Sequence, residues 1–123
     1  MVKTKRICDP PEASDGERFL VNRGKPPFRS WEELSLCGWL KCLGPSKELL
    51  QDWREKKISW EEYKSRYLEE MSGQGQREKI QELAGRASRG TMTLLCFEPE
   101  DEPHCHRHLL RRLIERAMAN RPA

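Results

Sequence analysis

The chain has 123 residues, 36% of them hydrophobic, and its 23 basic and 20 acidic side chains leave a formal net charge of +3. This length fits one domain with a single core, and the small net charge is not by itself the footprint of a nucleic-acid-binding protein. No apolar run is long enough for a transmembrane helix, and the basic N-terminus has no apolar signal core. We therefore expect a cytoplasmic protein with no membrane partner.

Five cysteines are present, at positions 8, 37, 42, 96 and 105. Their odd number and the lack of CxxC spacing argue against a disulfide framework and against a standard structural zinc site. Reduced thiols are the expected state.

The first third of the chain predicts two strands. One runs from Val2 to Cys8 and is ended by Pro10-Pro11, because consecutive prolines cannot donate to a strand ladder. The other runs from Arg18 to Arg23 and turns polar at its end. After a loop, the apolar spacing from Trp31 to Leu43 predicts a helix.

The middle of the chain predicts three further helices. Ser46 caps a helix that reaches about Lys57, and Ser59 opens a capping box for a helix that reaches about Ser72. A third amphipathic helix runs from Arg77 to Ser88, after a hinge-like break at residues 73–76.

The last part predicts a strand that passes into a helix. Thr91 to Phe97 has the composition of a buried strand, residues 98–103 form an acidic loop, and a helix begins near Cys105. The whole pattern predicts one α/β domain over residues 1–123, with a small, mainly parallel sheet of about three strands flanked by helices in a Rossmann-like, three-layer arrangement.

Several segments carry a family resemblance. The N-terminal third resembles the YeaO-like branch of the domain of unknown function 488 (DUF488) family, and the C-terminal third is similar to the LLCxE…CHR signature of the family's other branch. The matching residues are Lys5-Arg6, Asp9-Pro10, Ser14-Asp15-Gly16, Leu20-Val21, Arg23, Leu94 to Glu98 and Cys105-His106-Arg107. The resemblance implies an α/β fold in which the second and last strands are adjacent and parallel, and it implies no established reaction.

The polar residues at these two strand ends predict a ligand site. Ligands bind where parallel strands end and a helix begins, because free backbone N–H groups face the crevice there. Arg23 and Arg107, with Asn22 and with Lys25 at the rim, are the candidate ligand-binding residues. The expected ligand is a small anion, phosphorylated or nucleotide-like, bound in one cleft to which Glu98 and His106 also contribute.

The same junction holds the candidate catalytic residues Cys105, His106 and Glu98. A thiol in the first turn of a helix has a lowered pKa, so Cys105 is a candidate nucleophile or redox thiol. We expect it to be at least partly accessible and Cys96 to be buried.

Other interpretations stay open. A zinc site would draw on Cys96, Cys105 and the histidines 104, 106 and 108, but a mid-strand Cys96 and a Cys105 that points away from His104 favour no metal. Alternatively, the protein is a non-enzymatic interaction module, and these residues only hold the last strand and the last helix together. The sequence leaves open whether the protein is an enzyme, which cofactor it uses, whether it binds nucleic acid, and its oligomeric state.

Overall fold

A computed structural model describes residues 1–22, 24, 30–97 and 102–120 of the chain. In order, these residues form β1 (Val2–Arg6), the 3-10 helix η1 (Ala13–Asp15), β2 (Glu17–Leu20), α1 (Trp31–Leu34), β3 (Gly38–Trp39), the 3-10 helix η2 (Lys41–Leu43), α2 (Lys47–Arg54), α3 (Trp60–Glu70), α4 (Gln74–Ala87), β4 (Met92–Cys96) and α5 (His106–Ala119). This is the α/β fold that the sequence predicts.

The strands form one parallel four-stranded sheet in the order β1-β4-β2-β3. β4 lies between β1 and β2, and all five of its residues are buried, as is typical of a central parallel strand. Leu20 of β2 pairs with Leu95 of β4, so the predicted parallel neighbourhood of the second and last strands is confirmed.

The helix predicted from Trp31 to Leu43 is wrong. Within this range only Trp31–Leu34 is α-helical and Lys41–Leu43 forms a 3-10 helix. Ser35 follows the α-helical turn with a φ of 50°, which a right-handed helix cannot contain. The chain then pairs with the edge of β2, where Cys37 N–H donates to Arg18 O and Leu40 N–H donates to Leu20 O. The helix-like spacing arises because the segment crosses the sheet edge and buries its apolar residues in two separate clusters.

The other predicted helices are confirmed, with small shifts at their ends. Ser46 caps α2 by accepting from Leu49 N–H, and Ser59 caps α3 by accepting from Glu62 N–H. α4 begins at Gln74, three residues before the predicted start at Arg77, so the break after α3 is shorter than expected.

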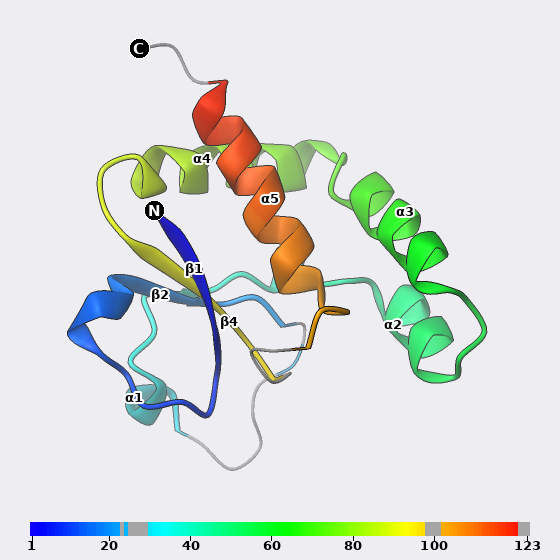
Figure 1. The fold of residues 1–123 in the computed structure, drawn as a ribbon, viewed down its shortest axis with the longest axis horizontal. Coiled ribbons are helices and arrows are strands. Elements are labelled where there is room, and N and C mark those ends of the chain that lie inside the picture. The colour runs from blue at the N-terminus through cyan, green and yellow to red at the C-terminus, as the bar shows by residue number, and fades with distance from the viewer. Residues whose placement is uncertain (23, 25–29, 98–101, 121–123) are drawn as a thin grey trace.

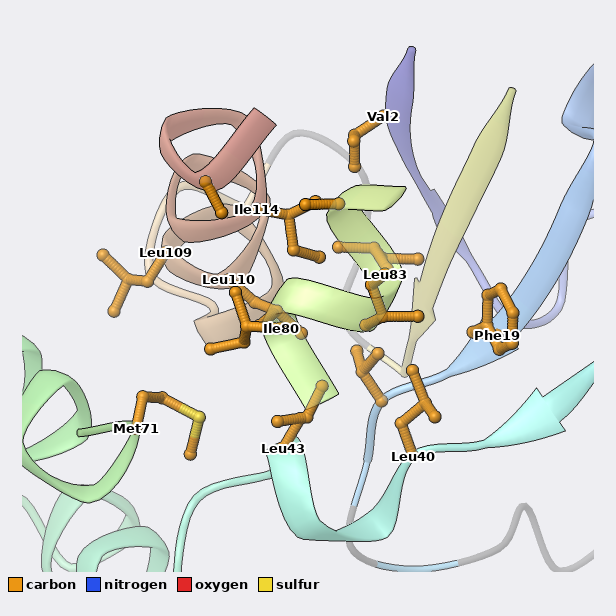
Figure 2. Packing of buried hydrophobic residues seen from close by; sticks show 14 of the residues in the cluster. Val2, Phe19, Leu40, Leu43, Met71, Ile80, Leu83, Leu109, Leu110 and Ile114 are labelled. Carbon is orange, nitrogen blue, oxygen red and sulfur yellow. The ribbon is translucent and has the colours of Figure 1, made fainter. Parts of the chain in front are cut away.

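The main core lies between one face of the sheet and the helices. Figure 2 shows Leu110 and Ile114 of α5, Ile80 and Leu83 of α4, and Phe19 of β2 directed toward one another. In Figure 1, α4 and α5 lie beside the strands, and α2 and α3 extend to one side. Each of these core residues is buried, so the helices that cover this face fix the position of the α5 N-terminus.

The opposite face of the sheet is covered by a smaller cluster that contains Ile7, Leu20, Leu34 and Leu95. The connection from β1 to β2 passes over this face, where Thr93 of β4 donates its Oγ1 hydrogen to Asp15 O. Gly16 follows with a φ of 65°, and a Cβ there would overlap the carbonyl oxygen of Thr91. The short connection therefore depends on glycine at this position.

Among the described residues, no helix has both the length and the apolar character that crossing a membrane requires.

Candidate functional site

Two cysteines meet at the carboxyl end of β4. Cys96 is the last residue of the strand, on the same face as Met92 and Leu94, and Cys105 is the N-cap residue of α5. Their Sγ atoms lie 3.2 Å apart. Both residues are buried, at 2% and 3% exposure.

His106 joins this pair from the first position of α5. Its Nε2 lies 2.8 Å from Val21 O, just beyond the end of β2, so the side chain ties the helix start to the neighbouring strand end. Burial lowers the pKa of His106 to about 4, so the imidazole is neutral near pH 7. The ends of β2 and β4 and the start of α5 thus converge, as the sequence predicts for this edge.

The three side chains form a compact cluster. One ligand-type atom from each of Cys96, Cys105 and His106 lies within 4.8 Å of the other two. His104 and His108 are not part of this cluster: His104 stacks on Trp60, and Nε2 of His108 lies 2.9 Å from Glu102 O. Cys96 is the last residue of β4 and not a mid-strand residue, so that argument against a joint metal site with Cys105 is wrong.

The expected accessibility and lowered pKa of Cys105 are also wrong. The hydrogen bond with Cys96, together with burial, raises the pKa of the Cys105 thiol far above its usual value. The backbone N–H and the charge of Arg107 act in the opposite direction but are weaker. Proximity to a helix N-terminus does not activate this thiol, because a second thiol and a desolvated pocket surround it.

A small cavity of about 60 Å³ adjoins the cluster. Its lining includes Cys96, Cys105, His106, Asn22 and the exposed His104. The Oδ1 atom of Asn22 is buried and has no hydrogen-bond partner among the described residues. The residues that line the cavity therefore carry two thiols, an imidazole and an amide oxygen without a partner among the described residues.

Arg107, a candidate ligand-binding residue, lies on the inner side of α5. It has 0% exposure, and its Nη1 donates to Lys5 O at 3.1 Å, which links α5 to β1. Of the other residues in the predicted cleft, Arg23, Lys25 and Glu98 lie outside the described residues. The structure thus brings His106 to the predicted strand ends and uses Arg107 in a bond to the sheet backbone.

The sequence analysis missed the pairing of Cys96 with Cys105. The available signal was the alternation of β4, which places Cys96 on the same face as Met92 and Leu94 and hence under the helices. A cysteine at the start of the following helix can then fold back onto it.

Comparison with known proteins identifies relatives. The chain matches the model of DUF488-N3a, described as the active DUF488-N3 subclade, over residues 2–118. It is 34% identical to the uncharacterized protein YeaO of Escherichia coli over 94 residues, which cover 76% of this chain and 80% of YeaO. It is 29% identical over 86 residues to the uncharacterized proteins Rv3073c of Mycobacterium tuberculosis and Mb3100c of Mycobacterium bovis, with 70% of this chain and 73% of each relative covered.

No solved structure gives a significant match. The family model spans almost the whole chain and includes both strand ends, both cysteines and the start of α5. The chain therefore belongs to the DUF488 family.

Proposed function

We propose that Cys96, Cys105 and His106 bind one thiophilic divalent metal ion, Zn²⁺ in the first instance. The observation that carries this proposal is the approach of the three ligand atoms to within 4.8 Å of one another in a buried cluster. Zinc takes thiolate and imidazole ligands, and three protein ligands with an open fourth position form the arrangement typical of catalytic zinc sites.

The separation of the sulfurs is close to what zinc requires. With Zn–S bonds of about 2.3 Å in a tetrahedral site, the two sulfurs would lie roughly 3.8 Å apart. The Sγ atoms of Cys96 and Cys105 are 3.2 Å apart, so a modest rotation of one side chain accommodates the ion.

The hydrogen bond of His106 also favours a metal ligand. A carbonyl oxygen only accepts, so Nε2 carries the hydrogen and donates to Val21 O, which leaves the lone pair on Nδ1. Imidazoles that bind metals commonly donate their other N–H to a carbonyl, which fixes the ring. With its pKa lowered to about 4, His106 is neutral, as a ligand must be.

The cavity beside the cluster supplies the open position. Its volume of about 60 Å³ has room for a metal-bound water. Asn22 is one of its lining residues, and the buried Oδ1 of Asn22 has no partner among the described residues. Zinc lowers the pKa of a bound water to about 7, so such a site is suited to metal-assisted hydrolysis. The description of the matching subclade as active agrees with a catalytic role.

The small anionic ligand expected from the sequence has less support. Arg107 is buried and bonded to Lys5 O, and the cavity is too small for a nucleotide. A single anionic group that reaches the open metal position remains compatible with this proposal.

A dithiol that closes to a disulfide is the second candidate, favoured by the 3.2 Å approach of the sulfurs. A hydroperoxide would oxidise one thiol to a sulfenic acid with release of an alcohol, and the other thiol would then displace water to form the S–S bond. The raised pKa of Cys105 makes the first step slow, because the thiolate is the nucleophile.

The test is metal titration of the reduced protein with Co²⁺ and Zn²⁺. We expect one ion per chain, thiolate-to-cobalt charge-transfer bands, displacement of Co²⁺ by Zn²⁺, and affinity that rises with pH because binding releases two thiol protons. Cys96→Ser and Cys105→Ser should abolish the bands, whereas Cys42→Ser, at an exposed cysteine, should keep them.

Cobalt bands that survive in the Cys96→Ser/Cys105→Ser double variant would overturn the metal proposal. Failure of the wild type to bind either ion, combined with formation of a Cys96–Cys105 disulfide on treatment with a hydroperoxide, would replace it with the dithiol function.

A further inference from the structure

A groove runs along the surface of α5, beside α3 and α4, and one end of it lies close to the Cys96–Cys105–His106 cluster. It consists of three adjoining cavities of about 260, 230 and 870 Å³. The first two share Lys64, Leu109 and Arg112, and the second and third share Leu68, Leu113 and Arg116. The shared lining makes the three cavities one continuous groove.

One side of the groove is a row of polar side chains spaced four residues apart. His104, His108, Arg112, Arg116 and Asn120 follow one another along α5 and the residues at its ends, and all five line the groove. Four residues of helix advance about 6 Å, so the row is roughly 24 Å long. Lys64 on α3 faces it across the groove.

The charge of this groove is one-sided. Among the described residues that line the two smaller cavities there is no acidic side chain, and Glu78 is the acidic residue in the lining of the third. Arg112 and Arg116 are exposed and form no ion pair with the described residues, whereas the neighbouring Arg111 faces Glu115 at 3.7 Å. The groove therefore presents two uncompensated guanidinium groups in line.

The floor and one end of the groove are apolar or aromatic. Leu68, 44% exposed, lies on the floor with Leu109 and Leu113. At the end near the Cys96–Cys105–His106 cluster, the exposed His104 ring stacks on Trp60, and the ring centroids are 4.7 Å apart. Tyr63 stacks on Trp60 as well, with ring centroids 5.0 Å apart, so the exposed His104 ring is the aromatic surface at this end of the groove. A row of cations beside an exposed ring is a combination with which proteins hold the phosphates and bases of a single strand.

We propose that this groove binds a single-stranded polynucleotide, with its phosphates along Arg112, Arg116 and Lys64 and a base against the exposed ring of His104. An acidic peptide would use the cations but not the aromatic end, which is why we favour the nucleic acid. His104 also lines the small cavity beside Cys96 and Cys105, so a strand in the groove would have one end close to that site. The proposal stands independently of metal binding.

The test is the binding of a fluorescent single-stranded oligothymidylate over a range of salt concentrations, with and without a chelator. We expect the logarithm of affinity to fall linearly with the logarithm of salt concentration, by about 0.7 per phosphate contact. Arg112→Gln/Arg116→Gln should weaken binding about tenfold at low salt and reduce the slope by about 1.4. The variant Arg6→Gln/Arg89→Gln removes the same charge at exposed sites outside the groove and should bind as the wild type does.

Two further arms test the aromatic end. His104→Ala should weaken oligothymidylate binding by several-fold with the salt slope unchanged, and an abasic strand with the same phosphates should bind several-fold more weakly than oligothymidylate. DNA and RNA strands of matched sequence show which of the two nucleic acids the groove binds more tightly. Tighter binding of either one supports the proposal.

Equal losses in the groove variant and the Arg6/Arg89 control would overturn the proposal in favour of non-specific attraction. Binding of polyglutamate as tight as that of the oligonucleotide would overturn it in favour of an acidic protein partner, and no binding at low salt would overturn it outright. Cobalt binding by the Arg112→Gln/Arg116→Gln variant, measured in parallel, separates failure of this proposal from failure of the metal site.

Discussion

The two faces of the sheet bury polar groups in opposite ways. On the face that carries η1, the Asp15 carboxylate accepts hydrogen bonds from Arg18 Nη1 at 2.6 Å, from Lys5 Nζ at 3.1 Å and from Glu12 N–H at 3.0 Å. On the face under α5, Cys96, Cys105 and His106 lie together as neutral groups. One cluster contains charges that compensate one another, and the other contains no compensating charge.

This difference separates structural polar groups from candidate functional ones. Burial raises the pKa of Asp15, but the bonds from Glu12, Lys5 and Arg18 outweigh that effect and hold the pKa below its usual value. The carboxylate is therefore satisfied without an external partner. The two thiols would need a cation to bring out their thiolate, ligating forms, whereas the neutral imidazole already has its ligating form. Asn22, whose Oδ1 has no partner among the described residues, lines the cavity beside them. Arg18 Nη2 on the charged face also lacks a partner among the described residues, so the contrast between the faces lies in charge balance and not in complete satisfaction.

The largest expected effect is on the charged face. Asp15→Ala leaves Arg18 and Lys5 buried or half-buried without their carboxylate, so unfolding should become easier by about 3–5 kcal/mol. Urea unfolding of metal-free protein measures this. Cys105→Ala is the matched change on the other face and should cost only about 1 kcal/mol. A cost for Cys105→Ala as large as that for Asp15→Ala would erase the contrast between the faces.

Acid should act on the two faces in separate pH windows. The pKa of folded His106 is about 4 against 6.5 for the free group, so the unfolded chain binds the additional proton between these values. Stability should fall by about 3 kcal/mol as pH is lowered from 6.5 to 4. Asp15 has a lowered folded pKa, so its contribution is present above pH 3.8 and is lost below that value.

Unfolding free energy measured against pH checks this separation. His106→Gln should flatten the upper window and leave the lower one, and His104→Gln, at an exposed histidine, should change neither. An upper window that persists in His106→Gln would assign it to another group.

Zinc should stabilise only through the uncharged face. At a free zinc concentration of about one hundred times Kd, the free energy of unfolding should rise by about 2.7 kcal/mol. Thermal unfolding with and without zinc measures this rise in wild-type protein and in Cys96→Ser, where it should vanish. Persistence of the rise in Cys96→Ser would place the stabilising ion elsewhere.

The smallest expected effect separates two neighbours on β4. Thr93 Oγ1 donates to Asp15 O on the charged face, three residues before Cys96 on the other face. Thr93→Val keeps the shape but loses this bond, at a cost of about 1 kcal/mol, and should leave metal affinity unchanged. Altered cobalt spectra in Thr93→Val would show that the two faces are coupled through the strand.

The residues explain which predictions could be made from sequence. β4 and α5 are recognisable because Thr91 to Phe97 is a dense apolar run and Cys105 is followed by leucines at helical spacing. The helix predicted from Trp31 to Leu43 is wrong because the apolar residues of this segment are divided between two cores, and their spacing in the sequence resembles that of one helix face. The contact of Cys96 with Cys105 joins the end of β4 to the start of α5, and sequence spacing alone does not encode such a contact between two elements.

The short β3 has a consequence for how the sheet ends. In the part of the chain that the structure describes, β1 and β3 are the outer strands, and β3 offers only two residues for pairing. On β1, the ammonium groups of Lys3 and Lys5 are drawn back to Ser14 O and Pro10 O of the connection to β2. Short outer strands and lysines are features that discourage one sheet from adding to another. We therefore expect little edge-to-edge aggregation of this sheet, whose fully buried strand, β4, lies between other strands.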